Sequence, residues 1–172
     1  MRLSGTILTA RDAAHLWLLQ KRRDDVVPVL ARGAIYHCGP VAMKDDIGKW
    51  KVCSAGPTTS ARMETYEGRV IKEYDVGIII GKGGMGRKTL EALAENRAVY
   101  LNAMGGLGAL DGSVIKDVRA VHMLDEFGIP EALWEIAVED MPAIVTMDCH
   151  GASLHEEVKA ASGTVRRSLL GQ

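Results

Sequence analysis

Hydrophobic and polar positions alternate along this chain in runs that predict strands and helices in turn. The most apolar run, residues 76–80, has no charged position and predicts a central strand buried on both faces. Residues 87–96 then place apolar side chains at helical spacing, and residues 98–103 predict another strand. A strand–helix–strand unit of this kind favours parallel pairing with a right-handed crossover.

Further elements are predicted on both sides of this unit. Three late strands follow one another without a helical pattern between them, so part of the sheet is expected to be antiparallel or to form a second layer. The sequence therefore predicts a mixed α/β domain, followed by a polar and partly helical tail over residues 151–172. The expected strands cover residues 4–9, 34–38, 51–54, 114–123, 133–138 and 143–147, and a further helix is expected over residues 60–74.

The first helix has its own start signal. Thr9 with Asp12 three residues later has the spacing of a capping box, which predicts a helix through residues 13–19. Arg11 then falls in the first turn of that helix, at its second position. The charged stretch over residues 20–25 predicts a solvated helix end, with cations placed favourably against the helix dipole.

Composition and charge narrow the class of protein. The chain has 172 residues, 47% of them hydrophobic and 25% charged, as expected for one globular domain rather than a disordered chain. Its net charge of −1 gives no basic field for a nucleic acid or a membrane surface. The three cysteines are an odd number and none lies in a Cys-x-x-Cys pair, and neither a signal peptide nor a membrane-spanning run is recognisable. These features predict a cytoplasmic protein in a reducing compartment.

A glycine-rich loop follows the central strand. Gly81, Gly83 and Gly86 match the G-x-G-x-x-G pattern of dinucleotide-binding loops, but the strand over residues 98–103 ends without an acidic residue for a ribose. The loop also approaches a P-loop, yet Arg87 stands where the phosphate-binding lysine belongs and the Lys-Thr pair comes one residue late. Both nucleotide interpretations are therefore disfavoured.

A simpler anion site remains possible at the same loop. A glycine turn at the carboxyl end of a parallel strand exposes backbone N–H groups and a helix N-terminus, and Lys82 lies in that turn. A glycine turn with a solvated lysine explains the same residues. The loop by itself leaves both interpretations open.

A second loop, over residues 56–63, carries the sequence Gly-Pro-Thr-Thr-Ser-Ala-Arg-Met. Its three consecutive hydroxyls precede a helix whose first turn carries Arg62, an arrangement suited to a carboxylate; the alternative is a hydroxyl helix cap with an exposed arginine. Arg11, Arg62 and Lys82 each lie at a strand-to-helix junction. If these junctions share one sheet edge, three cations converge and favour a small dianion as ligand.

Several segments together resemble a known enzyme family. Residues 9–15, 35–41, 54–63 and 80–83 resemble the iron–sulfur hydro-lyases of the class I fumarase and L-tartrate dehydratase family. The match is to the C-terminal domain of that family, which in many organisms is a separate β subunit. The resemblance assigns residues 1–150 to this domain and leaves residues 151–172 as an unassigned C-terminal extension.

The resemblance implies a fold and a set of site residues. The fold is expected to be the swivelling β/β/α domain with a mixed sheet. Thr58 is implied as catalytic base or base partner, with Arg62 and Lys82 beside it as catalytic residues that also grip substrate carboxylates. Arg11 and Thr59 are implied as substrate-binding residues. A lone threonine hydroxyl is a poor base at neutral pH, so Thr58 would need activation from a partner subunit.

The resemblance also implies a cofactor outside this chain. The family holds a 4Fe-4S cluster on three cysteines of its α subunit, and the cysteines present here do not match those ligands, so no metal ligand is expected. A zinc site is a conceivable alternative, although adjacent residues cannot easily point at one ion and buried cysteines explain the pattern as well. The residues of that alternative are His37, Cys38, Cys149 and His150.

The expected protein is a β subunit that is active only as a hetero-oligomer with its α subunit. The expected reaction is the reversible hydration of a C4 dicarboxylate, fumarate to L-malate. The alternatives are dehydration of L-tartrate to oxaloacetate and a non-catalytic domain that binds small anions.

Overall fold

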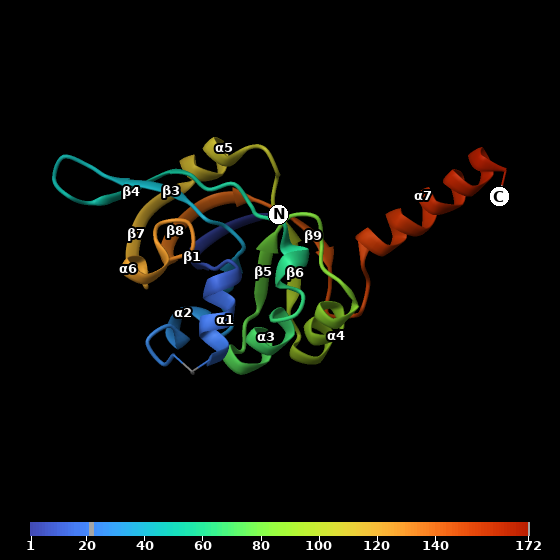
Figure 1. Ribbon diagram of the computed structural model, residues 1–172, viewed down its shortest axis with the longest axis horizontal. Helices are drawn as coiled ribbons and strands as arrows, with labels where there is room; N and C mark the ends of the chain where they lie inside the picture. Colours follow the sequence, from blue (N-terminus) through green and yellow to red (C-terminus); the bar gives the residue numbers. More distant parts are fainter. Residues whose placement is uncertain (21–22, 172) are drawn as a thin grey trace.

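A seven-stranded mixed sheet forms the centre of the molecule (Figure 1), whose computed structural model describes residues 1–20 and 23–171. Its order is β7-β8-β1-β2-β5-β6-β9. The four central strands are parallel, and the late strands pair antiparallel at both edges, which confirms the mixed α/β prediction. The strands are β1 (Arg2–Thr9), β2 (Ala34–Tyr36), β5 (Ile78–Gly81), β6 (Val99–Asn102), β7 (Ile115–His122), β8 (Leu133–Pro142) and β9 (Ile144–Met147).

The two faces of the sheet bury different layers. Leu8 of β1 packs into the cluster under the helices, whereas its neighbour Ile7 packs into the cluster on the opposite face, as the two-residue period of a strand requires. The helical layer holds α1 (Asp12–Gln20), α2 (Val27–Leu30), α3 (Glu67–Tyr74) and α4 (Arg87–Asn96). The other face is covered by the hairpin β3 (Val41–Lys44) and β4 (Trp50–Ser54), with α5 (Gly108–Ser113) beside it. The resulting α/β/β layering agrees with the β/β/α expectation.

The chain ends in a helix that leaves the body. After the short helix α6 (Leu124–Phe127) and the last two strands, α7 (Leu154–Leu170) projects away from the sheet (Figure 1). Ser153 caps it by accepting the backbone N–H of Glu156 at 3.3 Å. The tail is therefore helical, as expected in part. Within the described residues, no helix is long and apolar enough to cross a membrane.

The start of α1 differs from the prediction. The helix begins at Asp12, so Arg11 precedes it, and the Thr9 hydroxyl instead accepts the backbone N–H of Trp134 at 3.0 Å. A carboxylate from a distant loop satisfies the helix start, because the N–H of Ala13 donates to Glu131 at 3.1 Å. The capping-box interpretation was wrong because partners from β8 and its preceding loop compete with local ones.

The charged end of this helix is only partly described. Residues 21 and 22 of the predicted solvated stretch lie outside the described residues. Beyond them, Arg23 pairs with Asp25 at 3.0 Å and lies 4.3 Å from the ring centre of Trp17.

Two further differences concern residues 41–74. The helix expected over residues 60–74 is divided into a 3₁₀ turn, η1 (Ser60–Met63), and α3, with the intervening Glu64 side chain directed to the start of α4. Strand β3 was not predicted, because it pairs only with β4 and three of its four side chains are exposed, which leaves no buried run.

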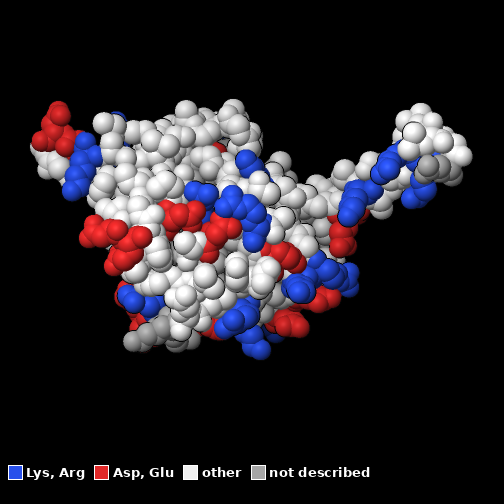
Figure 2. All heavy atoms as spheres, in the orientation of Figure 1, with Lys and Arg blue, Asp and Glu red and all other residues white. Residues whose placement is uncertain are grey.

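Charged side chains are interspersed over the visible face of the body. Figure 2 shows basic and acidic groups next to one another and no large surface of one sign. This agrees with the net charge of −1.

Candidate functional site

The carboxyl ends of three parallel strands lie at one edge of the sheet. Thr9 at the end of β1 pairs with Tyr36 of β2, and Tyr36 pairs with Ile80 of β5. Arg11 and Lys82 follow the outer two of these strands, so the predicted common edge exists.

The loop over residues 56–63 is tied to the same edge by its backbone. The N–H of Thr58 donates to the carbonyl of His37 at 2.7 Å, and the N–H of Ser60 donates to the carbonyl of Lys82 at 3.1 Å. Thr59 forms a parallel bridge with Lys82. All five predicted site residues therefore lie on segments that meet at this edge.

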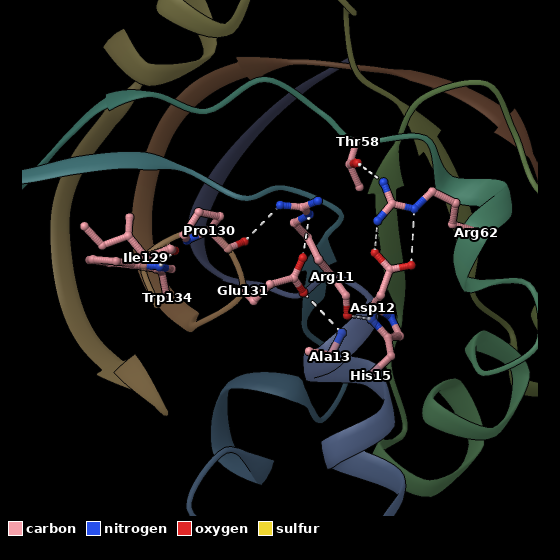
Figure 3. Close-up of polar contacts among 10 residues, drawn as sticks. All are labelled: Arg11, Asp12, Ala13, His15, Thr58, Arg62, Ile129, Pro130, Glu131 and Trp134. Atoms are coloured by element: carbon pink, nitrogen blue, oxygen red, sulfur yellow. Dashed lines mark hydrogen bonds and ion pairs between the residues drawn. The ribbon is translucent and has the colours of Figure 1, made fainter. Parts of the chain in front are cut away.

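Arg62 faces the start of α1. Its guanidinium pairs with both carboxylate oxygens of Asp12, with Nε 3.2 Å from Oδ1, and its Nη1 lies 3.5 Å from the Thr58 hydroxyl (Figure 3). The Arg62 side chain is 47% exposed and that of Asp12 36%. An ion pair so exposed contributes only about 0–1 kcal/mol, so a substrate carboxylate could displace Asp12 at small cost.

Arg11 is held more firmly. Its Nε lies 3.3 Å from Glu131, its Nη1 donates to the carbonyl of Pro130 at 3.3 Å, and its side chain is 22% exposed. Gly39 is required beside it, because a Cβ there would lie 2.4 Å from the Pro130 carbonyl and 2.8 Å from Arg11. Figure 3 shows both guanidinium groups over the start of α1, each against a carboxylate of the chain itself.

Lys82 is the third cation at this edge. Its side chain runs along the turn after β6, since a Cβ at Gly105 would lie 3.4 Å from Lys82 Cδ. Among the described residues, no carboxylate forms an ion pair with the Lys82 ammonium. Of the three predicted cations, it is the one that needs no displacement of a carboxylate to receive an anion.

The glycine loop does not offer the helix N-terminus that was considered for an anion. Glu64 occupies the start of α4, accepting the N–H of Gly86 at 2.7 Å and the N–H and hydroxyl of Thr89 at 3.2 and 2.8 Å. A carboxylate of the chain already satisfies these donors, so a phosphate has no place there. At the glycine loop, binding of an anion would therefore depend on the side chain of Lys82 and not on the helix N-terminus.

A buried cluster of polar side chains lies directly under the edge, and the sequence reasoning assigned it no role. Glu67 of α3 is fully buried, with its Oε2 3.2 Å from Nε2 of His15 and 2.8 Å from Nε2 of His37. His37 Nδ1 lies 2.9 Å from the hydroxyl of Ser60. Ser60, the last of the three consecutive hydroxyls considered for a carboxylate, points inward, and its oxygen also accepts a hydrogen bond from the hydroxyl of Tyr100 at 2.9 Å. The sequence offered one indication of this cluster, because both histidines fall in otherwise apolar segments.

The close contacts between Glu67 and the two histidines shift the pKa values of all three groups. Burial alone would raise the pKa of Glu67, but the two imidazoles beside it outweigh burial and lower that pKa well below its ordinary value. Burial acts to lower the pKa of His15, yet the adjacent Glu67 raises it overall. For His37 burial prevails, and its pKa is lowered.

The same cluster is the one geometry among the described residues that could hold a metal ion. His15, His37 and Glu67 offer three ligand atoms within 4.8 Å of one another. The zinc alternative with Cys38, Cys149 and His150 does not assemble, because His37 faces His15 and Glu67 instead. In the part of the chain described, the three cysteines form no ligand group either, so they do not fit an iron–sulfur cluster.

Comparisons with known proteins identify the family of this chain. A family described as the fumarase C-terminus matches residues 1–158. A Geobacillus stearothermophilus protein provisionally named fumarate hydratase class I is 50% identical over 163 residues, which are 94% of this chain and 31% of that protein. The chain thus spans about a third of that relative's length.

Two other relatives are closer to this chain in size. A Methanocaldococcus jannaschii protein provisionally named L(+)-tartrate dehydratase subunit beta is 45% identical, with 91% of this chain and 81% of the relative aligned. The L(+)-tartrate dehydratase subunit beta of Escherichia coli K12 is 38% identical, with 91% and 77% aligned. The chain belongs to the fumarase C-terminus family, together with relatives named as class I fumarate hydratase and L-tartrate dehydratase β subunits.

Proposed function

We propose that this chain is the β subunit of an iron–sulfur hydro-lyase that interconverts fumarate and L-malate. The observation that carries the proposal is that Arg11, Arg62 and Lys82 lie on segments that meet at one sheet edge, with Arg62 beside the Thr58 hydroxyl. A C4 dicarboxylate has a charge at each end and needs cationic groups for both. The family membership supports the same class of reaction.

The arginines and the lysine would bind and orient the diacid. Arg62 already presents its guanidinium to a carboxylate through two N–H groups, in the geometry that a substrate carboxylate would take after displacing Asp12. Lys82 would supply a point charge for the other end, and Arg11 would strengthen the field from its more buried position. Thr59, exposed next to Thr58, would orient the substrate.

Thr58 would take part in proton transfer. In the dehydration direction, a proton leaves the carbon next to the one that loses hydroxide, and the Thr58 oxygen would accept it. The positive charge of Arg62, 3.5 Å from that oxygen, favours its anionic form but cannot by itself make a neutral hydroxyl a strong base. Activation from the partner subunit is therefore part of the proposal.

The 4Fe-4S cluster is assigned to the α subunit, since no cysteine group of the described chain fits it. The proposed complex is thus a hetero-oligomer in which this chain supplies the carboxylate clamp. The free cysteines fit a reducing, cytoplasmic setting.

L-Tartrate is the second candidate substrate, because two relatives of similar length are named tartrate dehydratase β subunits. Both diacids require the same cationic clamp. A third possibility is a non-catalytic domain that binds small anions.

The test is reconstitution with the α subunit. The two chains are combined without oxygen, the cluster is rebuilt, and turnover of fumarate, L-malate and L-tartrate is compared by kcat/KM. Each chain alone is expected to be inactive and the complex active, with fumarate and L-malate preferred. A higher kcat/KM for L-tartrate would move the assignment to the second candidate. A cluster-loaded complex inactive on all three would leave only the anion-binding domain.

A further inference from the structure

We propose that four buried side chains, Ser60, His37, Glu67 and His15, form a positioning network that holds the substrate-binding segments in register. This buried network is continuous from the backbone of Lys82 to the backbone of Arg11. Its members touch no substrate and act through the residues above them. The inference rests on the proposed function, because the segments that it joins are the proposed substrate clamp.

His15 carries hydrogen on both ring nitrogens. Its Nδ1 lies 2.8 Å from the carbonyl of Arg11, which can only accept a hydrogen bond, so Nδ1 carries hydrogen. Its Nε2 lies 3.2 Å from a Glu67 oxygen, and a bare lone pair there would be repelled by the carboxylate. Both ring nitrogens therefore carry hydrogen, and His15 is the cation that balances buried Glu67.

His37 carries hydrogen on Nε2 only. Its Nε2, 2.8 Å from Glu67, carries hydrogen for the same reason. The Ser60 oxygen accepts hydrogen bonds from the Tyr100 hydroxyl at 2.9 Å and from the Lys82 N–H at 3.1 Å. The hydroxyl hydrogen of Ser60 is therefore available to donate to Nδ1 of His37. His37 is then neutral, and the network holds one positive and one negative charge.

The buried network is tied to the substrate-binding segments through three backbone groups. At one end, the Arg11 carbonyl accepts a hydrogen bond from Nδ1 of His15. At the other end, the Lys82 N–H donates to the hydroxyl oxygen of Ser60. In the middle, the backbone carbonyl of His37 receives the N–H of Thr58. Three of the proposed site residues, Arg11, Thr58 and Lys82, are thus fixed by their backbones to a single buried set of side chains.

The fit around this set is tight. A Cβ at Gly81 would lie 1.9 Å from the Ser60 oxygen and 3.0 Å from His37 Nδ1, so β5 must end in glycine to admit the network. Apolar side chains of similar volume would stabilise such a core at least as well as buried charges do. A role in geometry accounts for the polar residues better than a role in stability.

One feature distinguishes this network from an ideal hydrogen-bonded one. The Nε2–Oε2 contacts are poorly aligned as hydrogen bonds, and Glu67 Oε1 has no partner among the described residues. A divalent cation bound to His15, His37 and Glu67 would replace the two Nε2 hydrogens. Metal analysis of the purified chain, with added Zn²⁺ as the probe, distinguishes a metal site from a network with hydrogen on both Nε2 atoms. One tightly bound equivalent of Zn²⁺ that is lost in His15→Asn would overturn the placement of these hydrogens.

The protonation states have a direct readout in the isolated chain. In ¹⁵N-histidine NMR spectra at pH 7, His15 is expected to show two protonated ring nitrogens and His37 only a protonated Nε2. Glu67→Gln should convert His15 to a neutral ring, whereas Glu73→Gln on the exposed side of α3 should leave both signals unchanged. A neutral His15 in the wild type would overturn the proposal.

The positioning role is tested in the reconstituted complex. Ser60→Ala removes the acceptor of the Lys82 N–H and should lower kcat/KM about tenfold or more, mainly through a higher KM. Ser113→Ala, an exposed serine of α5, is the matched control. His15→Asn keeps a donor at the Nδ1 position toward Arg11, whereas His15→Gln keeps one at the Nε2 position toward Glu67, so KM should rise less in His15→Asn.

The outcomes separate this inference from the proposed function. An active wild type with unchanged KM in folded Ser60→Ala and His15→Gln variants would overturn the positioning role and leave the function standing. A cluster-loaded wild type without turnover on any diacid would overturn both, even if the NMR signals match. If Glu67→Gln fails to fold, the serine and His15 variants still decide the question.

Discussion

At the scale of single residues, the proposed clamp is occupied by the chain's own carboxylates. Arg62 rests on Asp12 and Arg11 on Glu131, so a dicarboxylate must compete with intramolecular partners. The half-exposed Asp12 is the easier of the two to displace, which makes Arg62 the expected first contact for the substrate.

Replacing Arg62 with lysine tests this contact. Lys keeps the charge but loses the two-pronged geometry, so kcat/KM of the complex should fall by about one to two orders of magnitude while the fold is retained. Arg69→Lys, in an exposed pair with Glu73 on α3, is the matched control and should be neutral. A wild-type kcat/KM in Arg62→Lys would exclude Arg62 from the site.

Thr58 and Lys82 are expected to act at different stages. Thr58→Val removes the hydroxyl at nearly constant volume and should lower kcat about 10²-fold with little change in KM, if Thr58 transfers a proton. Lys82→Met removes a charge that holds the substrate throughout, so KM should rise at least as much as kcat falls. Iron content is measured in both variants and in the control Thr65→Val, because cluster loss would mimic either effect. A rise in KM alone for Thr58→Val would make Thr58 a binding group.

At the scale of elements, two helices of this edge are capped by distant carboxylates. Glu131 satisfies the start of α1 and Glu64 the start of α4, so neither helix N-terminus is free for a ligand. This directs an incoming anion to the side chains of Arg11, Arg62 and Lys82 rather than to the N-terminus of α1 or α4.

The Glu64 cap has a measurable consequence. Glu64→Ala leaves the first N–H groups of α4 without their partner and should lower the free energy of unfolding by about 1–2 kcal/mol, as measured by urea denaturation. Glu95→Ala, exposed in the last turn of the same helix, should cost much less. Equal losses for the two variants would contradict the capping role.

At the scale of the whole molecule, the buried network joins α1, η1 and α3 to the ends of β1, β2 and β5, in one unit whose stability depends on pH. Its three titratable groups shift in different directions, since the pKa is lowered for Glu67 and His37 and raised for His15. The network therefore links the helical layer and the sheet through protonation as well as packing.

The sign of the pH dependence follows from these shifts. Above the ordinary histidine pKa of 6.5, folded His15 keeps a proton that the unfolded chain has lost, so stability falls as pH rises toward the raised folded value. Below pH 6.5, the unfolded chain binds a proton at His37 that the folded chain binds only at lower pH, and below pH 4.5 the same holds for Glu67. Stability therefore falls again as the pH decreases. The contribution of this network to the free energy of unfolding should be largest near pH 6.5, with a slope of at most about 1.4 kcal/mol per pH unit for each proton.

The alkaline side of this curve is specific to His15. Urea denaturation of His15→Asn should show no decline between pH 6.5 and 8, whereas the exposed His150→Asn control should keep the wild-type decline. A flat alkaline side in the wild type would contradict the raised pKa of His15.

The sequence by itself determined the elements that depend on neighbouring residues. The unit β5–α4–β6 follows from local periodicity, and the helix over residues 87–96 has the predicted bounds. The positions of Arg11, Arg62 and Lys82 near strand ends follow from the same patterns, and parallel pairing then brings Arg11 and Lys82 to one edge. Hydrophobic period and glycine or proline breaks are local, which is why the sequence is sufficient for them.

Only the tertiary structure decided which polar groups meet. Asp12 finds Arg62 50 residues away, and the Thr9 hydroxyl finds the N–H of Trp134 125 residues away. His15, His37 and Glu67 come from three separate elements, and nothing in their local sequence indicates that they touch. A polar side chain takes whichever partner the fold brings within reach, and burial makes that partner obligatory. The clamp residues could therefore be named from the sequence, whereas the carboxylates that occupy them and the network beneath them required the fold.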